Sequence, residues 1–238
     1  MVMTNMTRTN RTLVIMAKAP RLGSVKTRLT KTLPVQAVTE LYQCFLNDTI
    51  ALAQTIDHVE TAIMCPVPDV EDLSRALANP ARVVPQTGKG LAAALDCVFA
   101  RFAGNGSARV VAFNSDSPHL PASVLQAAFD VLETCDLVVG PTHDGGYYLV
   151  GAKASYPGLF GHDSMGTTNA LDALFERSSR LHLSLCLVEP FYDIDIGEDL
   201  RRLAEELQRV PGKAPRTAKW LANWASAAPP LEQANPAL

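Results

Sequence analysis

The sequence has few features that would cross-link a fold or insert it into a membrane. No apolar run approaches the roughly 20 residues that a membrane helix needs, and the polar first ten residues lack the apolar core of a secretion signal. The cysteines are odd in number, lie far apart and form no CxxC pair, which predicts reduced thiols rather than a disulfide framework or a zinc site. We therefore expect a cytoplasmic protein without a membrane partner. The five cysteines are Cys44, Cys65, Cys97, Cys135 and Cys186.

An excess of positive charge is also missing. The 21 Lys and Arg residues are outnumbered by 24 Asp and Glu residues, for a net charge of −3, which argues against a general nucleic-acid binder. The charge is nevertheless uneven, because every charged residue before Glu40 is basic. This segment suits an anionic ligand, although for Arg8 and Arg11 a solvated basic tail explains the charge equally well.

Short β-rich apolar runs alternate with longer helical patterns along the chain. This alternation predicts an α/β fold with a mostly parallel, mixed central sheet covered on both faces, a three-layer α/β/α arrangement. We expect one domain over residues 12–225, with disordered tails at 1–11 and 226–238. The expected strands are 12–17, 58–65, 82–85, 110–114, 137–140, 147–152 and 183–188, and the expected helices are 34–55, 69–78, 88–102, 121–134 and 197–207.

Ligands of such sheets bind beyond the carboxyl ends of the strands, so the loops there should carry the chemistry. The loop after the first strand, from Lys18 to Arg28, is basic and contains Gly23, which permits a tight turn. Lys18, Lys26 and Arg28 can bind the oxygens of a di- or triphosphate, although no Walker A pattern is present. The alternative is a solvated basic loop.

Carboxylates follow two later strands. Asp116 lies two residues beyond the expected strand 110–114, where a hard oxygen ligand would hold Mg²⁺ or Mn²⁺ bound to substrate phosphates. A helix cap or an Asx turn before Pro118 is the alternative. In an extended segment Asp193 and Asp195 would point to the same side and could bind one cation. For Asp195 the competing role is a helix N-cap, and the following acidic residues suit the first turn of a helix.

A third strand-end loop contains Asp144-Gly145-Gly146. Its two glycines would let backbone N–H groups approach a ligand closely, while His143 and Asp144 supply polar contacts. A tight hairpin explains the glycines almost as well. His119 and His162 carry little weight, since no His/Cys spacing suggests zinc.

Four ordered motifs resemble a known bacterial group. KAPRLGSVKTRL, NSDSPHLP, GPTHDGGYYLVG and YDIDIGEDL span about residues 12–208. They resemble the glycosyltransferase-like, radical-SAM/selenodomain-associated transferases of the nucleotide-diphospho-sugar transferase superfamily, which has the GT-A fold. VKTRL followed by GKGLAAAL is also similar to the related phospho-lactate and phosphoenolpyruvate guanylyltransferases.

The resemblance implies a nucleotide over the N-terminal half of the sheet. Its phosphates would lie near Lys18, Lys26 and Arg28, and its metal on Asp116 and Asp195. Gly88, which begins GKGLAAAL, would belong to the nucleotide-binding set. Gly145, Gly146 and Thr167 would line the acceptor side.

Three functions remain open at this point. The preferred one is a metal-dependent nucleotidyltransferase that joins an NMP from an NTP to a small phosphorylated or carboxylated acceptor and releases pyrophosphate. Lys26, Arg28 and Asp116 would be its catalytic residues. The second is a glycosyltransferase that uses an NDP-sugar, with His143 or Asp144 as general base. The third, a non-catalytic nucleotide-binding protein, rests on residues 86–94, which lack the acidic residue and arginine of the transferases.

Overall fold

A mixed seven-stranded sheet organises the protein. The computed structural model describes residues 10–76, 82–103, 108–161 and 167–227. Its strand order is β3-β2-β1-β4-β6-β5-β7, and β6 pairs antiparallel with β4 and β5 while the other pairs are parallel. The α/β fold and mostly parallel sheet predicted from the sequence are thus confirmed. The strands are β1 (Arg11–Met16), β2 (Glu60–Cys65), β3 (Arg82–Pro85), β4 (Arg109–Asn114), β5 (Leu137–Pro141), β6 (Tyr147–Ala152) and β7 (Leu185–Leu187).

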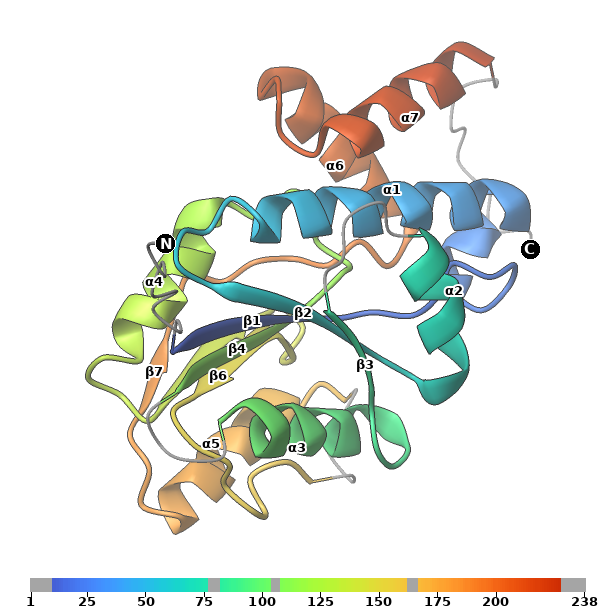
Figure 1. Cartoon of the computed structure of the whole chain (residues 1–238). Coiled ribbons are helices and arrows are strands. Elements are labelled where there is room, and N and C mark those ends of the chain that lie inside the picture. The colour runs from blue at the N-terminus through green and yellow to red at the C-terminus, as the bar shows by residue number, and fades with distance from the viewer. Residues whose placement is uncertain (1–9, 77–81, 104–107, 162–166, 228–238) are drawn as a thin grey trace, which may run out of the picture.

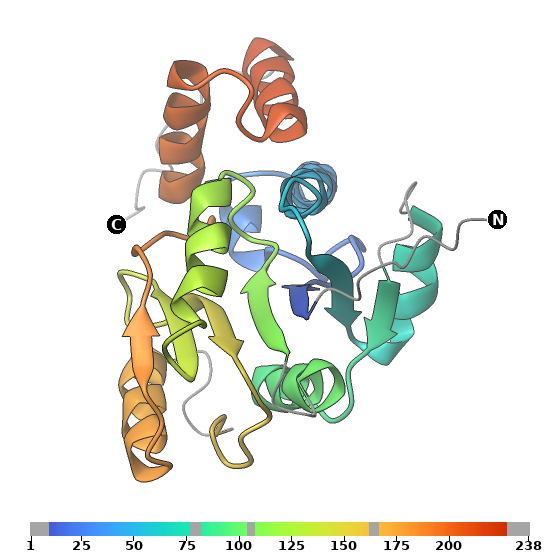
Figure 2. The same cartoon turned by 60° about the vertical axis from the view of Figure 1, so that its left-hand side comes forward.

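Helices cover both faces of this sheet (Figures 1 and 2). Helices α1, α2 and α4 pack on one face, α3 and α5 on the other, and the red helices α6 and α7 lie on the outer side of α1. No helix in the described ranges is long and apolar enough to span a membrane. The helices are α1 (Val35–Ala53), α2 (Val70–Ala76), α3 (Gly90–Phe102), α4 (Ala122–Val131), α5 (Ala170–Arg180), α6 (Gly197–Arg209) and α7 (Pro215–Ala227), with short 3₁₀ helices η1 (Thr27–Lys31) and η2 (Val67–Asp69).

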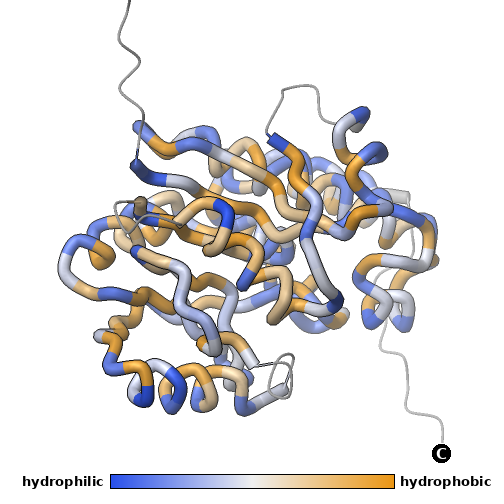
Figure 3. The backbone as a smooth tube through the Cα atoms, turned by 60° about the horizontal axis from the view of Figure 1, so that its bottom comes forward, coloured by the Kyte–Doolittle hydropathy of each residue, from blue (hydrophilic) through white to orange (hydrophobic). Residues whose placement is uncertain are grey.

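The two-residue period of the strands explains the two cores. In β1, Leu13 and Ile15 pack toward α1 and α4, whereas Val14 packs toward α3, and all three side chains are fully buried. Successive side chains of a strand point to opposite faces, so a strand covered on both sides must be apolar throughout. The covering helices instead alternate apolar and polar segments along the tube of Figure 3.

A third cluster joins α6 and α7 to the outer face of α1. Leu41 and Phe45 of α1 pack against Leu203 of α6 and Leu221 of α7. The buried carboxylate of Asp48 accepts the backbone N–H groups of residues 216 and 217 at 3.2 and 2.8 Å, and so caps the start of α7. Helices α5, η1 and α7 were not predicted from the sequence.

Several expected boundaries were wrong. Arg11 belongs to β1, where its guanidinium lies 3.4 Å from the Glu133 carboxylate and over the ring of Phe129, so it is not part of a tail. Helix α7 continues to residue 227, past the expected domain end at 225, and α4 ends three residues before Thr134. Leu91 of α3 is 45% exposed, although its position fits the apolar period of the helix. Arg8, His162 and most of the two expected tails lie outside the described residues.

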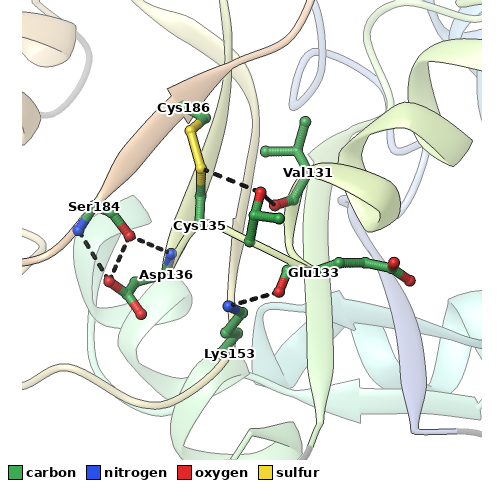
Figure 4. The surroundings of a disulfide bond; sticks show 8 residues. Val131, Glu133, Cys135, Asp136, Lys153, Ser184 and Cys186 are labelled. Carbon is green, nitrogen blue, oxygen red and sulfur yellow. Dashed lines mark hydrogen bonds between the residues drawn. A yellow bond between two sulfur atoms is a disulfide. The ribbon is translucent and has the colours of Figure 1, made fainter.

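The prediction of five reduced thiols is also wrong. Cys135, just before β5, and Cys186 of β7 form a disulfide with a Cα–Cα distance of 6.3 Å (Figure 4). Asp136 adds hydrogen bonds at the same junction, since its carboxylate accepts the N–H and the hydroxyl of Ser184 at 2.9 and 2.6 Å. The pairing was invisible in the sequence because the two cysteines are 51 residues apart and meet only through the parallel β5–β7 ladder.

We expect reduction of this disulfide to destabilise the protein. Opening the cross-link should lower the free energy of unfolding by about 2–4 kcal/mol, because the reduced chain has more unfolded conformations. Urea unfolding with and without a reducing agent measures the difference. Cys135→Ser should abolish the effect of the reducing agent, whereas Cys97→Ser should retain it. An unfolding midpoint that is the same in both buffers would contradict the prediction.

Candidate functional site

The carboxyl ends of the parallel strands surround a cavity of about 880 Å³. Met16 of β1 pairs with Asn114 of β4, so the loops that follow these two strands begin side by side. An isolated bridge between Thr142 and Phe191 brings the segment after β7 to the same edge. Among the lining residues are Lys18, Lys26, Arg28, Asn114, Asp116, Thr142, Asp144, Gly146, Tyr147, Thr167, Asp193 and Asp195.

An ion-pair cluster lies in the wall of this cavity. The Lys26 Nζ is 3.0 Å from the Asp116 Oδ2 and 2.8 Å from the Asp195 Oδ1, and only 4% of the lysine side chain is exposed. Lys26 has a left-handed backbone, with φ of 46°, at the point where η1 begins. Buried Val25 and Leu29 anchor the segment on either side, which aims the lysine stem inward. Three distant parts of the chain therefore share one charge centre.

The electrostatics of this cluster favour a permanently charged lysine. Burial alone would lower the pKa of Lys26, because it disfavours the ammonium form. The negative charges of Asp116 and Asp195 outweigh burial and raise the pKa well above its ordinary range. Lys26 is therefore a fixed cation and not a general base.

Asp193 differs from Asp195 in its partners. Its Oδ1 accepts hydrogen bonds from the Asn114 amide and the Ser117 hydroxyl, both at 2.8 Å. Burial, and then the neighbouring charge of Asp116, raise the pKa of Asp193 to about 6. The two carboxylates thus do not hold one common cation in this structure. The metal role predicted for Asp193 stays a prediction.

Asp195 is not the N-cap of the following helix. The Asp199 carboxylate of α6 instead accepts the backbone N–H groups of Asp195 and Ile196, both at 2.9 Å. This leaves both oxygens of Asp195 for cations: Lys26 at one and the Arg28 guanidinium, 3.4 Å away, at the other. Asp116 is likewise not the Asx residue of its turn, because Asn114 accepts the Asp116 N–H at 3.2 Å.

Tyr42 of α1 lines the cavity and was not predicted as a site residue. Its hydroxyl lies 2.9 Å from the hydroxyl of Ser115 and accepts the Lys18 N–H at 3.2 Å, so it ties the loops after β1 and β4 together. Burial and the charge of Asp116 raise the pKa of Tyr42 to about 12. The available signal was the residue type, since a buried tyrosine usually needs a partner for its hydroxyl.

The basic loop divides into two functional parts. Arg21 points away from the cavity, where its guanidinium pairs with Asp69 at 2.5 Å and with Asp72 at 2.6 Å and fixes the loop to η2 and α2. Lys18, Lys26 and Arg28 line the cavity instead, and both Lys18 and Arg28 are exposed to it. The alternative of a wholly solvated loop therefore does not describe the buried Lys26.

The turn from Thr142 to Gly146 forms the opposite wall. The Asp144 carboxylate accepts the Thr142 hydroxyl at 2.5 Å and the Gly146 N–H at 3.2 Å, and these hydrogen bonds lower its pKa. Gly145 has φ of 85°, and a Cβ there would lie 1.9 Å from the Thr168 carbonyl oxygen. The glycine is thus required by contact with the segment before α5.

Of the remaining residues predicted for the site, some line the cavity and others do not. Gly23, Gly88 and Gly145 are not among the residues that line the cavity, while Thr167 is. Gly23 and Gly88 have positive φ angles of 71° and 77°, so each is explained by its turn. His143 is exposed outside the lining, and His119 is fully buried between aromatic rings, where burial lowers its pKa to about 4. Gln86, Leu91 and Tyr147 line the cavity and were not predicted.

Replacement of Asp193 by asparagine should stabilise the metal-free protein above pH 6. The pKa of Asp193 is higher in the folded than in the unfolded chain, so its contribution to stability falls as the pH rises from about 4 to 6. The amide oxygen of the introduced side chain could still accept the same hydrogen bonds, and we expect a gain on the order of 1 kcal/mol at pH 8 that vanishes near pH 4.

Urea unfolding of Asp193→Asn and wild type across this pH range tests the prediction. Asp57→Asn, at an exposed position, is the matched control and should show no comparable gain. A variant less stable than wild type at pH 8 would show that the carboxylate stabilises the site.

The strand order and the cavity at the carboxyl edge define the class of protein, which has the fold of the nucleotide-diphospho-sugar transferases. The chain belongs to the family described as "Uncharacterized protein conserved in bacteria (DUF2064)", whose model matches residues 49–167, half of the sequence. Both findings agree with the resemblance found in the motifs. No curated protein matches the sequence.

Solved structures support the same fold. A protein of Desulfovibrio desulfuricans G20, provisionally assigned as a nucleotide-diphospho-sugar transferase, aligns with a TM-score of 0.83 at 25% identity, over 92% of this chain and 96% of its own. A nucleotidyl transferase of Methanothermobacter thermautotrophicus aligns with a TM-score of 0.53 at 19% identity, over 84% and 99%. The 4-diphosphocytidyl-2C-methyl-D-erythritol synthase of Anaerococcus prevotii gives 0.54 at 11%, over 84% and 97%. The last two show the fold alone.

Proposed function

We propose that this transferase is a metal-dependent nucleotidyltransferase that joins an NMP from an NTP to a small acceptor and releases pyrophosphate. The transferase class rests on the likeness to the D. desulfuricans structure, which covers nearly the whole chain. The observation that carries the specific reaction is the single cavity in which Lys18, Lys26 and Arg28 face Asp116 and Asp195. Fixed cations beside carboxylates that can bind a metal suit the charge of a triphosphate.

The residues fit a divalent metal through Asp116 and Asp195. These two carboxylates already share one cation in the structure, since the Lys26 ammonium contacts both. No three His, Cys, Asp or Glu side chains of the described residues are grouped to hold a metal. Asp116 and Asp195 suit Mg²⁺ or Mn²⁺ brought in with the nucleotide, because Mg²⁺ in particular is usually held by one or two carboxylates, phosphate oxygens and water. A bound metal would neutralise charge on the phosphates.

The protein itself would mainly align the reactants. Arg28 and Lys26 would bind the leaving pyrophosphate, and Lys18 would position the α-phosphate for attack by the acceptor. The Thr142–Gly146 turn, with Thr167, would form the acceptor side. No covalent nucleophile is needed, because positioning and offset of charge supply the rate enhancement of phosphoryl transfer.

Glycosyl transfer from an NDP-sugar is the second candidate. It is favoured by the assignment of the D. desulfuricans protein and by the opposite wall of the cavity, where Thr142, Asp144 and Thr167 present oxygen atoms that a sugar could bind. Asp144 would then be the nearer choice for general base, since His143 does not line the cavity.

A product assay separates the two reactions. Each NTP and a set of NDP-sugars is incubated with Mg²⁺ or Mn²⁺ and pooled phosphorylated acids, alcohols and sugars. We expect pyrophosphate from one NTP, and loss of at least about 100-fold in rate for Asp116→Asn because the phosphates lose a metal ligand. Nucleoside diphosphate released from an NDP-sugar would instead establish glycosyl transfer. Metal-dependent nucleotide binding without either product would mean either that the pool lacks the acceptor or that the protein is non-catalytic.

Arg28→Ala tests the phosphate-binding role of the basic loop. The variant should weaken NTP binding by about tenfold or more, because a charge-assisted hydrogen bond contributes about 1.5–3 kcal/mol, while nucleoside binding stays unchanged. Calorimetric titration of both ligands measures this. Lys31→Ala is the matched control, since it removes the same charge from the same 3₁₀ helix at an exposed position outside the cavity lining. Equal losses for nucleoside and NTP would exclude a phosphate contact.

A further inference from the structure

Lys26 fills the position between the two carboxylates that a cation would share. Its Nζ is within 3.0 Å of one oxygen of Asp116 and one of Asp195, and its side chain is almost wholly enclosed. The ammonium thus stands at the centre of the candidate metal site, and not beside it. A metal on the same two oxygens would lie within a few ångströms of this nitrogen.

Two cations cannot occupy this position together. The ammonium and a divalent ion would repel each other strongly at such a separation in a partly buried site. The exposed Arg28 contacts the other oxygen of Asp195, so it can keep this contact when a metal replaces the Lys26 ammonium. Entry of a metal therefore requires the Lys26 ammonium to leave.

We propose that Lys26 is an internal counter-ion that holds the metal position of the empty enzyme and exchanges places with the metal when a metal–nucleotide complex binds. The inference rests on the proposed function. Free metal would bind weakly, because it must displace the ammonium into solvent or an empty cavity. Metal that arrives with phosphates would bind well, because the displaced ammonium gains phosphate oxygens as new partners.

The backbone around Lys26 suits an exchange made by the side chain alone. Val25 is 5% exposed and Leu29 is fully buried, so the segment is anchored on both sides. The lysine stem has four flexible carbons and lies in the wall of an open cavity of about 880 Å³. The ammonium can therefore move toward bound phosphates without a shift of η1.

The exchange predicts two effects of opposite sign for Lys26→Met. Binding of Mn²⁺ alone should tighten by about tenfold or more, because the carboxylates are released, whereas binding of Mn²⁺ with an NTP should weaken by a similar factor. Electron paramagnetic resonance counts free Mn²⁺, and calorimetry gives the NTP affinity. Both readouts are independent of turnover.

Matched variants separate exchange from a general charge effect. Lys18→Met removes one positive charge from the same cavity, and Lys31→Met removes one outside it, so neither should change Mn²⁺ affinity by more than about threefold. Asp116→Asn placed in the Lys26→Met background should abolish the gain. If Lys18→Met tightens Mn²⁺ binding as much as Lys26→Met does, the proposal that Lys26 exchanges with the metal is wrong.

Thermal unfolding provides a second measurement if Lys26→Met is destabilised. In this variant Asp116 and Asp195 repel each other without the ammonium, so its melting temperature should be lower than that of wild type. Added Mn²⁺ should then raise the melting temperature more in the variant than in wild type. An equal Mn²⁺ shift in both proteins, or unchanged Mn²⁺ affinity, overturns the exchange. Pyrophosphate release by wild type with Mg²⁺ or Mn²⁺ would in that case leave the proposed function standing.

Discussion

The ammonium of Lys26, buried between Asp116 and Asp195, is the interaction on which the site depends. It joins the loop after β1, the loop after β4 and the segment after β7, which are far apart in the sequence. A buried charge is costly unless it is paired, so each of the three segments is constrained by the other two. Much of the surrounding hydrogen bonding serves to keep these three groups in place.

The sheet order makes this meeting possible. β4 lies directly beside β1, so Asp116 and Lys18 leave adjacent strands at the same edge. β7 is a short edge strand at the far side, but the chain returns along that edge, where the Ile194 N–H donates to the Asp116 carbonyl oxygen at 3.1 Å. Hydrogen bonds from Ser117 and Asn114 to Asp193 reinforce this contact. The carboxylates are thus positioned by backbone pairing as well as by the lysine.

The sequence revealed those parts of the fold and site that follow from local pattern. Apolar runs of strand length predicted all seven strands, and the basic loop and Asp116 lie at the expected edge. What it could not reveal depends on contacts between distant segments: the Cys135–Cys186 pair, the different partners of Asp193 and Asp195, and the hydroxyl of Tyr42. Helix α7 was also missed, and its start is fixed by a distant group, the buried carboxylate of Asp48. Leu91 fits the apolar period of α3, but its side chain is 45% exposed because it lies where the helix meets the open cavity.

Helix α1 helps to position both carboxylates that contact Lys26, Asp116 and Asp195. Its Tyr42 holds Ser115 beside Asp116, and its outer face packs against α6, whose Asp199 fixes the backbone of Asp195. The C-terminal helix pair therefore supports the candidate site although neither helix lines the cavity. Local opening of α6 and α7 would cost less than global unfolding, yet it would separate Asp195 from Lys26. We therefore expect the heat tolerance of the activity to depend on how firmly this hairpin is docked on α1, and not on the strength of its sheet.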